Sequence, residues 1–381
     1  TERPGCLEIS SICVPVVGSC CDENDALIDI PLGFVTTDDS GDGRGGMYFN
    51  ITLSEKQRVG ALAIGGTGGG DGHATVLDVT AGAFFDRAGN PCPEQLGIPI
   101  KEFGDDIRPI IMSAVLRLSD GMLKIETSEV VDVTPVDYLK AENFYLTNTD
   151  NATDYGTDNQ INLQGARVTN QTFELQTGHD PRSAYNTGFL DNGLYIYFEL
   201  TEAQRVRAIE LSATAGGDGV ALTLDVKKSA FRDIAQNRND NLKDIPVTEI
   251  ADDFPPTLIS ATIDLGTGVA HFLGSETLDI TPASKVVLEL LQIRNDDSAG
   301  VAPYDHILWL NGHDSGTALV TTEEDGYTFS VNLTEAQRAR TIYMSDTPGG
   351  DGNAAVIVRS IIGSLTDIGQ LTSAVSTSVT A

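Results

Sequence analysis

Three segments of the chain alternate apolar and polar residues in the manner of a half-buried β-strand. They are residues 47–53, 194–200 and 327–333. The last residue of each segment begins nearly the same six-residue motif: Leu, Ser or Thr, Glu, a variable residue, Gln and Arg. The three copies of this motif end at Arg58, Arg205 and Arg338. Such repetition indicates a fold built from copies of one structural unit.

The spacing of the copies sets the expected unit boundaries. Arg58 and Arg205 lie 147 residues apart, and Arg205 and Arg338 lie 133 apart. The motif around Asp105 also recurs 147 residues later, around Asp252. We therefore expect units at 1–104, 105–251 and 252–381, with an insertion in the middle one. Projected backwards by the same period, the first unit lacks the front strands, so we expect it to be truncated.

Local signals suggest how each unit is built. Thr201 with Gln204, and Thr334 with Gln337, have the form of a capping box, which predicts a single helical turn after the alternating strand. Residues 208–211 and 220–226 then read as two strands joined by a hairpin at Gly-Gly-Asp-Gly. About seven strands per complete unit are expected of an immunoglobulin-like sandwich. The predicted fold class is all-β, with tandem immunoglobulin-like β-sandwich domains.

A second set of motifs supports this fold through a resemblance. The motifs are the strand after Pro255-Pro256, the Ser-Glu-x-x-Asp-x-Thr-Pro word at 275–282 and the Asp-x-Ala-Gly-Asn word at 86–90. Together they resemble the tandem immunoglobulin-like repeats of large microbial surface and fibre proteins. The resemblance implies a structural or adhesive module without catalytic residues.

Charge and composition limit the classes of molecule that the protein is expected to bind. The net charge of −31 disfavours nucleic acid and anionic membranes as partners and favours solubility or divalent cations. No apolar stretch approaches the length of a membrane span, so we expect no membrane insertion. The numbering begins without an initiator Met, as in a processed secreted protein. We therefore expect a secreted protein, extracellular or on the cell surface.

The cysteines agree with an oxidising compartment, because all five fall in the first unit. They are Cys6, Cys13, Cys20, Cys21 and Cys92. An odd number predicts up to two disulfides and one remaining thiol, with the connectivity open. No Cys-x-x-Cys pair is present, so a zinc site is disfavoured.

Candidate binding chemistry is sparse. The Gly-Gly-Asp-Gly words are followed by no Lys-Ser/Thr pair, which favours turns over phosphate loops. Asp38, Asp39 and Asp42 resemble the opening of a calcium loop, but Phe49 stands where an EF-hand has Glu, so only a looser calcium site remains. No catalytic motif is present, and we expect no enzyme and no cofactor other than calcium. The recurring Glu and Arg predict a salt bridge that fixes the end of each unit.

Four sequons mark candidate glycosylation sites in a eukaryotic source. They are Asn50, Asn151, Asn170 and Asn332. We expect Asn151 and Asn170 to carry glycan on an exposed loop of the middle unit.

These features predict a structural subunit of an extracellular filament. A truncated first unit would expose strand edges, which recruit other chains. The tail offers an alternating strand with one apolar face, at Val375, Thr377, Val379 and Ala381. Its insertion into the first unit of another copy would polymerise the chain head to tail. The alternating run around residues 12–16 is a competing donor. A monomeric adhesin that binds glycan or calcium is the alternative function.

Overall fold

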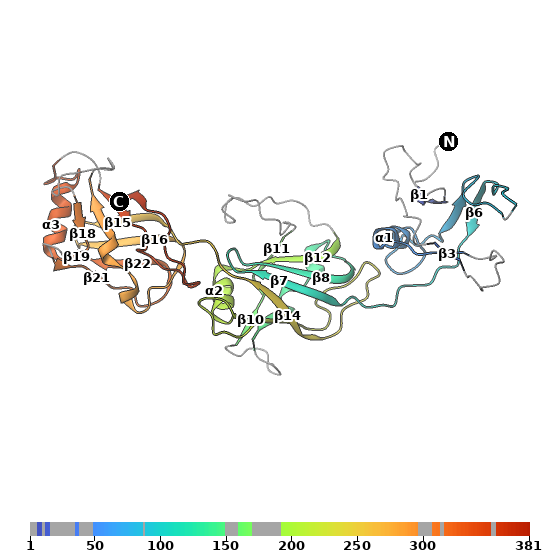
Figure 1. Ribbon diagram of the computed structural model, residues 1–381, viewed down its shortest axis with the longest axis horizontal. Coiled ribbons are helices and arrows are strands. Elements are labelled where there is room, and N and C mark those ends of the chain that lie inside the picture. Colours follow the sequence, from blue (N-terminus) through green and yellow to red (C-terminus); the bar gives the residue numbers. More distant parts are fainter. Residues whose placement is uncertain are drawn as a thin grey trace.

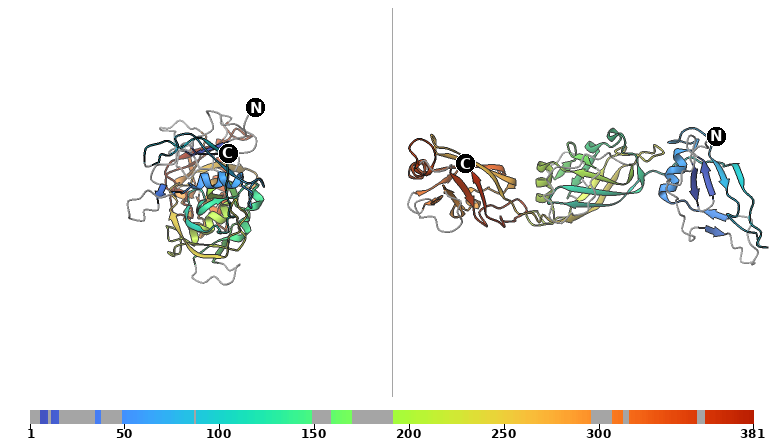
Figure 2. Two further views of the ribbon diagram at one scale, coloured as in Figure 1. Left: turned by 90° about the vertical axis from the view of Figure 1, so that its right-hand side faces the viewer. Right: turned by 90° about the horizontal axis from the view of Figure 1, so that it is seen from above.

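A computed structural model describes residues 49–86, 88–148, 159–169, 192–295, 307–312, 316–351 and 356–381. Strand positions are also described at 6–9, 12–15 and 35–37. Strands dominate these residues, so the all-β prediction is confirmed. The three units follow one another along an elongated molecule (Figures 1 and 2).

The middle unit is one curled, eight-stranded sheet, in the order β10-β9-β13-β14-β7-β8-β12-β11. Its elements are β7 (Ile111–Arg117), β8 (Met122–Val131), β9 (Phe144–Thr147), β10 (Gln160–Asn162), β11 (Arg167–Thr169), β12 (Gly193–Glu199), α2 (Glu202–Glu210), β13 (Thr223–Val226) and β14 (Leu242–Ile250). The expected two-sheet form is not seen here, because β14 pairs antiparallel with β13 and then parallel with β7. The sheet encloses a buried cluster that includes Phe144, Phe198 and Phe231.

The third unit has two four-stranded sheets, β15-β16-β22-β21 and β18-β17-β23-β24, and a short β19-β20 pair. Its elements are β15 (Leu258–Asp264), β16 (Val269–Leu278), β17 (Leu291–Arg294), β18 (Ile307–Trp309), β19 (Asn311–Gly312), β20 (Gly316–Thr317), β21 (Leu319–Val320), β22 (Gly326–Asn332), α3 (Glu335–Met344), β23 (Ile357–Ser360) and β24 (Thr377–Thr380). Phe272 and Phe329 stack at its core, with ring centroids 4.6 Å apart.

The described part of the first unit contains fewer strands than the other two units. Its sheet runs β1-β2-β5-β6, beside a separate β3-β4 pair. Its elements are β1 (Cys6–Ile9), β2 (Ile12–Pro15), β3 (Val35–Thr37), β4 (Phe49–Ile51), α1 (Glu55–Ala63), β5 (Val76–Val79) and β6 (Gln95–Pro99). Among its described residues no strands correspond to β7 and β8, which supply Leu116, Leu123 and Ile125 to the core of the middle unit.

The helices are longer than a single turn, which corrects the prediction. They contain nine, nine and ten residues, and each begins with a complete capping box. Residues 208–210, expected in a strand, complete α2 instead. A capped first turn rich in Ala, Gln, Glu and Arg favours continued helix, and Ala208 and Ile209 are buried on one side of it.

Candidate functional site: the junctions between units

Each helix lies at one end of its unit. In Figure 1, α1 faces the middle unit, α2 lies between the middle and third units, and α3 lies at the far end of the third. The predicted salt bridge is confirmed in all three helices, with Nε to carboxylate distances of 2.7 Å. The pairs are Arg58–Glu55, Arg205–Glu202 and Arg338–Glu335.

At the second junction this pair crosses into the third unit. The Arg205 guanidinium donates from Nη1 to Asp252 at 2.7 Å and from Nη2 to Glu276 at 3.2 Å. Glu202 accepts the backbone N–H of Thr277 at 3.0 Å. Arg205 is 4% exposed, and its Nη1 also donates to the carbonyl of Leu118 in its own unit. One arginine therefore ties the end of the middle unit to the start of the third.

The first junction repeats this arrangement with the corresponding residues. Arg58 donates to Asp105 at 2.6 Å and to Glu129 at 3.0 Å, and Glu55 accepts the N–H of Val130 at 2.8 Å. The Arg58 side chain is 32% exposed. Among the described residues of the first unit, no turn corresponds to the one that carries Leu118, which agrees with this greater exposure.

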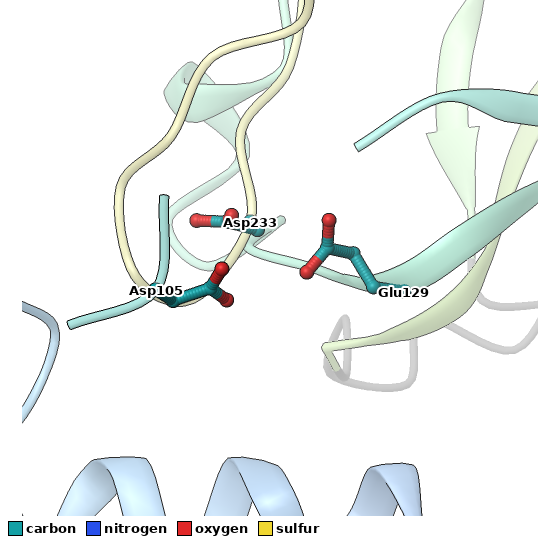
Figure 3. Close-up of side chains that lie close together, drawn as sticks. All are labelled: Asp105, Glu129 and Asp233. Carbon is teal, nitrogen blue, oxygen red and sulfur yellow. The ribbon is translucent and has the colours of Figure 1, made fainter. Parts of the chain in front are cut away.

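A third carboxylate completes each acceptor group. Asp233 joins Asp105 and Glu129, and Asp367 joins Asp252 and Glu276. Within each group one carboxylate oxygen from every residue lies within 4.8 Å of the others. Figure 3 shows the first group, whose carboxylates face a common space although they come from the linker, strand β8 and the loop after β13. We call these two groups the junction triads.

Burial and mutual repulsion make it harder for the carboxyl groups of the triads to ionise, so they raise the pKa of one acid in each triad. Burial, followed by the charges of Asp233 and Asp105, raises the pKa of Glu129 to about 7. Burial, followed by the charge of Asp252, raises the pKa of Asp367 to about 7. The nearby arginine opposes each shift without cancelling it. The triads are thus short of positive charge.

The glycine-rich words also lie at the junctions, which corrects their reading as hairpin turns. Each connects a helix to the next strand, and in the first two copies the first glycine of the repeated motif, Gly69 or Gly216, contacts the following unit. A Cβ at Gly216 would lie 2.0 Å from the carbonyl oxygen of Ile368, and one at Gly69 would lie 2.3 Å from that of Ile234. Ile368 itself joins the buried cluster of the middle unit. Glycine is required because the next unit approaches the backbone directly.

Replacing Gly216 by Ala is therefore expected to loosen the second junction. Gly349 is the matched control, because it also has a positive φ but its Cβ would meet only Ile342 of its own unit, at 3.6 Å. Both variants carry the cost of a left-handed Ala, and Gly216→Ala adds about 1–3 kcal/mol of steric displacement. Calorimetric unfolding of both variants measures the difference. Equal destabilisation would contradict the close contact at Ile368.

The third unit presents the donor half of a junction without an acceptor among the described residues. Arg338 pairs with Glu335 and donates to the Leu265 carbonyl at 2.8 Å, as Arg205 does to Leu118. The Glu335 side chain is 75% exposed. Conversely, Asp86 of the first unit corresponds to Asp233 and is exposed.

The other predicted site residues are located as follows. The calcium candidates Asp38, Asp39 and Asp42 lie outside the described residues, as do Cys20, Cys21, Asn151 and Asn170. Cys6, Cys13 and Asn50 lie on β1, β2 and β4, and Asn332 is exposed on β22. Cys92 is a free, buried thiol whose Sγ lies 3.6 Å from the Thr80 carbonyl. Because this thiol is buried, Cys92 is poorly placed to form a disulfide with another chain.

The tail is also placed differently from the donor role predicted for it. Strand β24 pairs with β23 of its own unit, and Val379 and Ala381 pack on that unit's core. It continues the repeat, because Ile98 opposite Leu77, Ile245 opposite Leu224 and Val379 opposite Val358 hold the same register. The tail is therefore a regular strand of the third unit.

Sequence reasoning missed the junction triads, although their signal was present. Asp105 and Glu129 recur with the spacing of the repeat as Asp252 and Glu276. The repeat alone does not bring them together, because nothing local indicates that Arg58 and Arg205 reach into the next unit.

Comparison with known proteins provides no assignment for these junctions: no family model matches the chain, and no curated protein matches it either. Among the described residues no helix is both long and apolar enough to cross a membrane. The site must therefore be interpreted from its own geometry.

Proposed function

We propose that this protein is a structural subunit of an extracellular filament, made of immunoglobulin-like units, in which a strand of a second copy completes the first unit. The supporting observation is the open core of that unit. Leu77 and Ile51 are only half-buried, whereas their counterparts Leu224 and Phe198 are fully buried in the middle unit.

The opening forms an apolar groove. A cavity of about 740 Å³ lies beneath α1, lined by side chains that include Ile51, Leu62, Leu77 and Ile100. The acids Asp105 and Glu129 of the first junction also line it. An apolar groove of this kind accepts an extended segment with one apolar face.

The flanking strands offer backbone pairing to such a segment. In the middle unit, β12 pairs with β8, and β14 pairs with β7. Their counterparts β4 and β6 each lie at an edge among the described strands. Open edges promote association with other chains because their N–H and C=O groups are unpaired.

The N-terminal run is the better donor of the two that the sequence suggested. Four positions pair β24 with β23, and its removal would uncover the third core. Only Ile12 and Cys13 of β2 pair with β5. An exchange of the N-terminal run between copies therefore costs less pairing, and the assembly grows into a filament when successive insertions do not close on themselves.

Replacing Leu77 by Lys is expected to abolish assembly. The half-buried position tolerates a long side chain that reaches solvent, but the charge blocks the groove. Leu96→Lys is the control, because Leu96 is exposed on β6 of the same unit and lies outside the groove. Negative-stain microscopy and light scattering would show fibres for the natural protein and Leu96→Lys, and single rods for Leu77→Lys.

Two results would contradict the proposal. Single rods of the natural protein at every concentration would exclude the filament and favour an adhesin. Fibres of Leu77→Lys as long as those of the natural protein would show that the groove takes no part in assembly.

A further inference from the structure

The junction triads hold more negative charge than their protein partners neutralise. At the second junction the guanidinium of Arg205 faces Glu202 as well as Asp252, Glu276 and Asp367. All members of this triad are buried. A buried charge is costly unless a partner of opposite charge compensates it, and one guanidinium cannot compensate four carboxylates.

In each triad at least one carboxylate oxygen also lacks a hydrogen-bond partner. Asp367 is fully buried, and its Oδ1 accepts the N–H of Leu371 at 2.9 Å, whereas its Oδ2 has no hydrogen-bond partner. At the first junction, Glu129 is 7% exposed; its Oε2 accepts from Arg58 and its Oε1 has no partner. A buried oxygen without a protein donor can be satisfied by a bound ion or by water.

The arrangement is specific rather than a chance gathering of acids. It occurs twice, with an Asp from the linker, a Glu from the second strand of the unit and an Asp from the loop before the last strand. Within each triad, the three acids come from chain segments that are far apart in sequence. In both, the arginine of the preceding unit binds two of the acids. The third acid accepts hydrogen bonds from its own loop, Asp233 from Asn237 and Asp367 from Leu371.

We propose that each junction triad binds a divalent cation, Ca²⁺, so that the protein carries one ion at each of its two junctions. Ca²⁺ binds six to eight oxygen ligands, mostly carboxylates, carbonyls and waters, and accepts irregular geometry. The triads offer carboxylate oxygens alone, which disfavours zinc and other metals that prefer nitrogen or sulfur.

The ion would act on the linkers between units. Asp105 and Asp252 lie on the linkers, whereas the other four acids belong to the body of the unit that follows. An ion shared by all three acids ties the linker to that unit and leaves Arg58 or Arg205 paired with the preceding one. Calcium would therefore stiffen the rod, whether or not the rod forms filaments.

Calcium binding to the chelator-treated full chain tests this proposal. Titration calorimetry should detect two ions bound at the triads, with Kd on the order of 10⁻⁴ to 10⁻³ M as in other extracellular modules. Glu129→Gln and Asp367→Asn should each remove one ion, and the double variant should remove both. Asp86→Asn is the control. Asp86 corresponds to Asp233 and accepts hydrogen bonds from Asn90 in its own loop, but it belongs to no triad, so the number of bound ions should stay unchanged. Any ion that remains in the double variant belongs to another site.

Thermal unfolding provides a second readout that a purely structural role of the acids would not give. In chelator, Asp367→Asn should unfold at the same temperature as the natural protein or higher, because it removes an uncompensated buried charge. In millimolar Ca²⁺ the natural protein should gain stability, and the double variant should lose that gain. An equal gain in the double variant, or an unchanged ion count, would overturn the proposal.

Discussion

Replacing Arg205 by Ala is expected to uncouple the middle and third units. The substitution leaves Glu202, Asp252 and Glu276 without their cation in a buried junction. Removing one partner of a buried ion pair costs about 3–5 kcal/mol, because the remaining charge stays uncompensated. Calorimetry should show the third unit unfolding at a lower temperature, and small-angle scattering should show a wider range of angles between the units.

Arg338→Ala is the matched control for this experiment. Arg338 forms the same pair with its glutamate on α3 but meets no acid of a following unit among the described residues. An exposed pair of this kind is screened by solvent and contributes little to stability. Similar losses in the two variants would mean that the bridge within the helix, and not the contact across the junction, stabilises the rod.

Replacing Leu224 by Ala should destabilise the middle unit strongly. Leu224 is fully buried on β13, so its truncation leaves a cavity that costs about 2–5 kcal/mol. Leu77→Ala changes the same residue at the same position of the repeat, but Leu77 is half-buried and already borders the groove. Its cost should be less than half as large in the unassembled protein.

Hydrogen exchange, read separately for peptides of each unit, measures both effects within the full chain. Filaments provide a further comparison, since the cost of Leu77→Ala should rise once a donor strand covers the groove. Equal costs in the unassembled chain would contradict the open core of the first unit and, with it, the proposed assembly.

The repeat in the sequence was enough to predict much of the local structure. The alternating strands before Arg58, Arg205 and Arg338 form as expected, as do the capping boxes. The truncation of the first unit, expected from the spacing, stays a prediction. The length of the helices was underestimated, because residues 208–210 satisfy both a short strand and an amphipathic helix, and only packing against the sheet distinguishes them.

The sequence by itself determined the signals that act over a few residues: strand alternation, helix caps and the bridge between Glu202 and Arg205, three residues apart. The tertiary structure alone decided where that arginine points. Asp252, Glu276 and Asp367 are separated by up to 115 residues in the chain and meet only when the third unit has folded and docked. Burial then turns three ordinary acids into a group that lacks positive charge, since the penalty for an uncompensated charge depends on the surrounding protein and not on the neighbouring sequence.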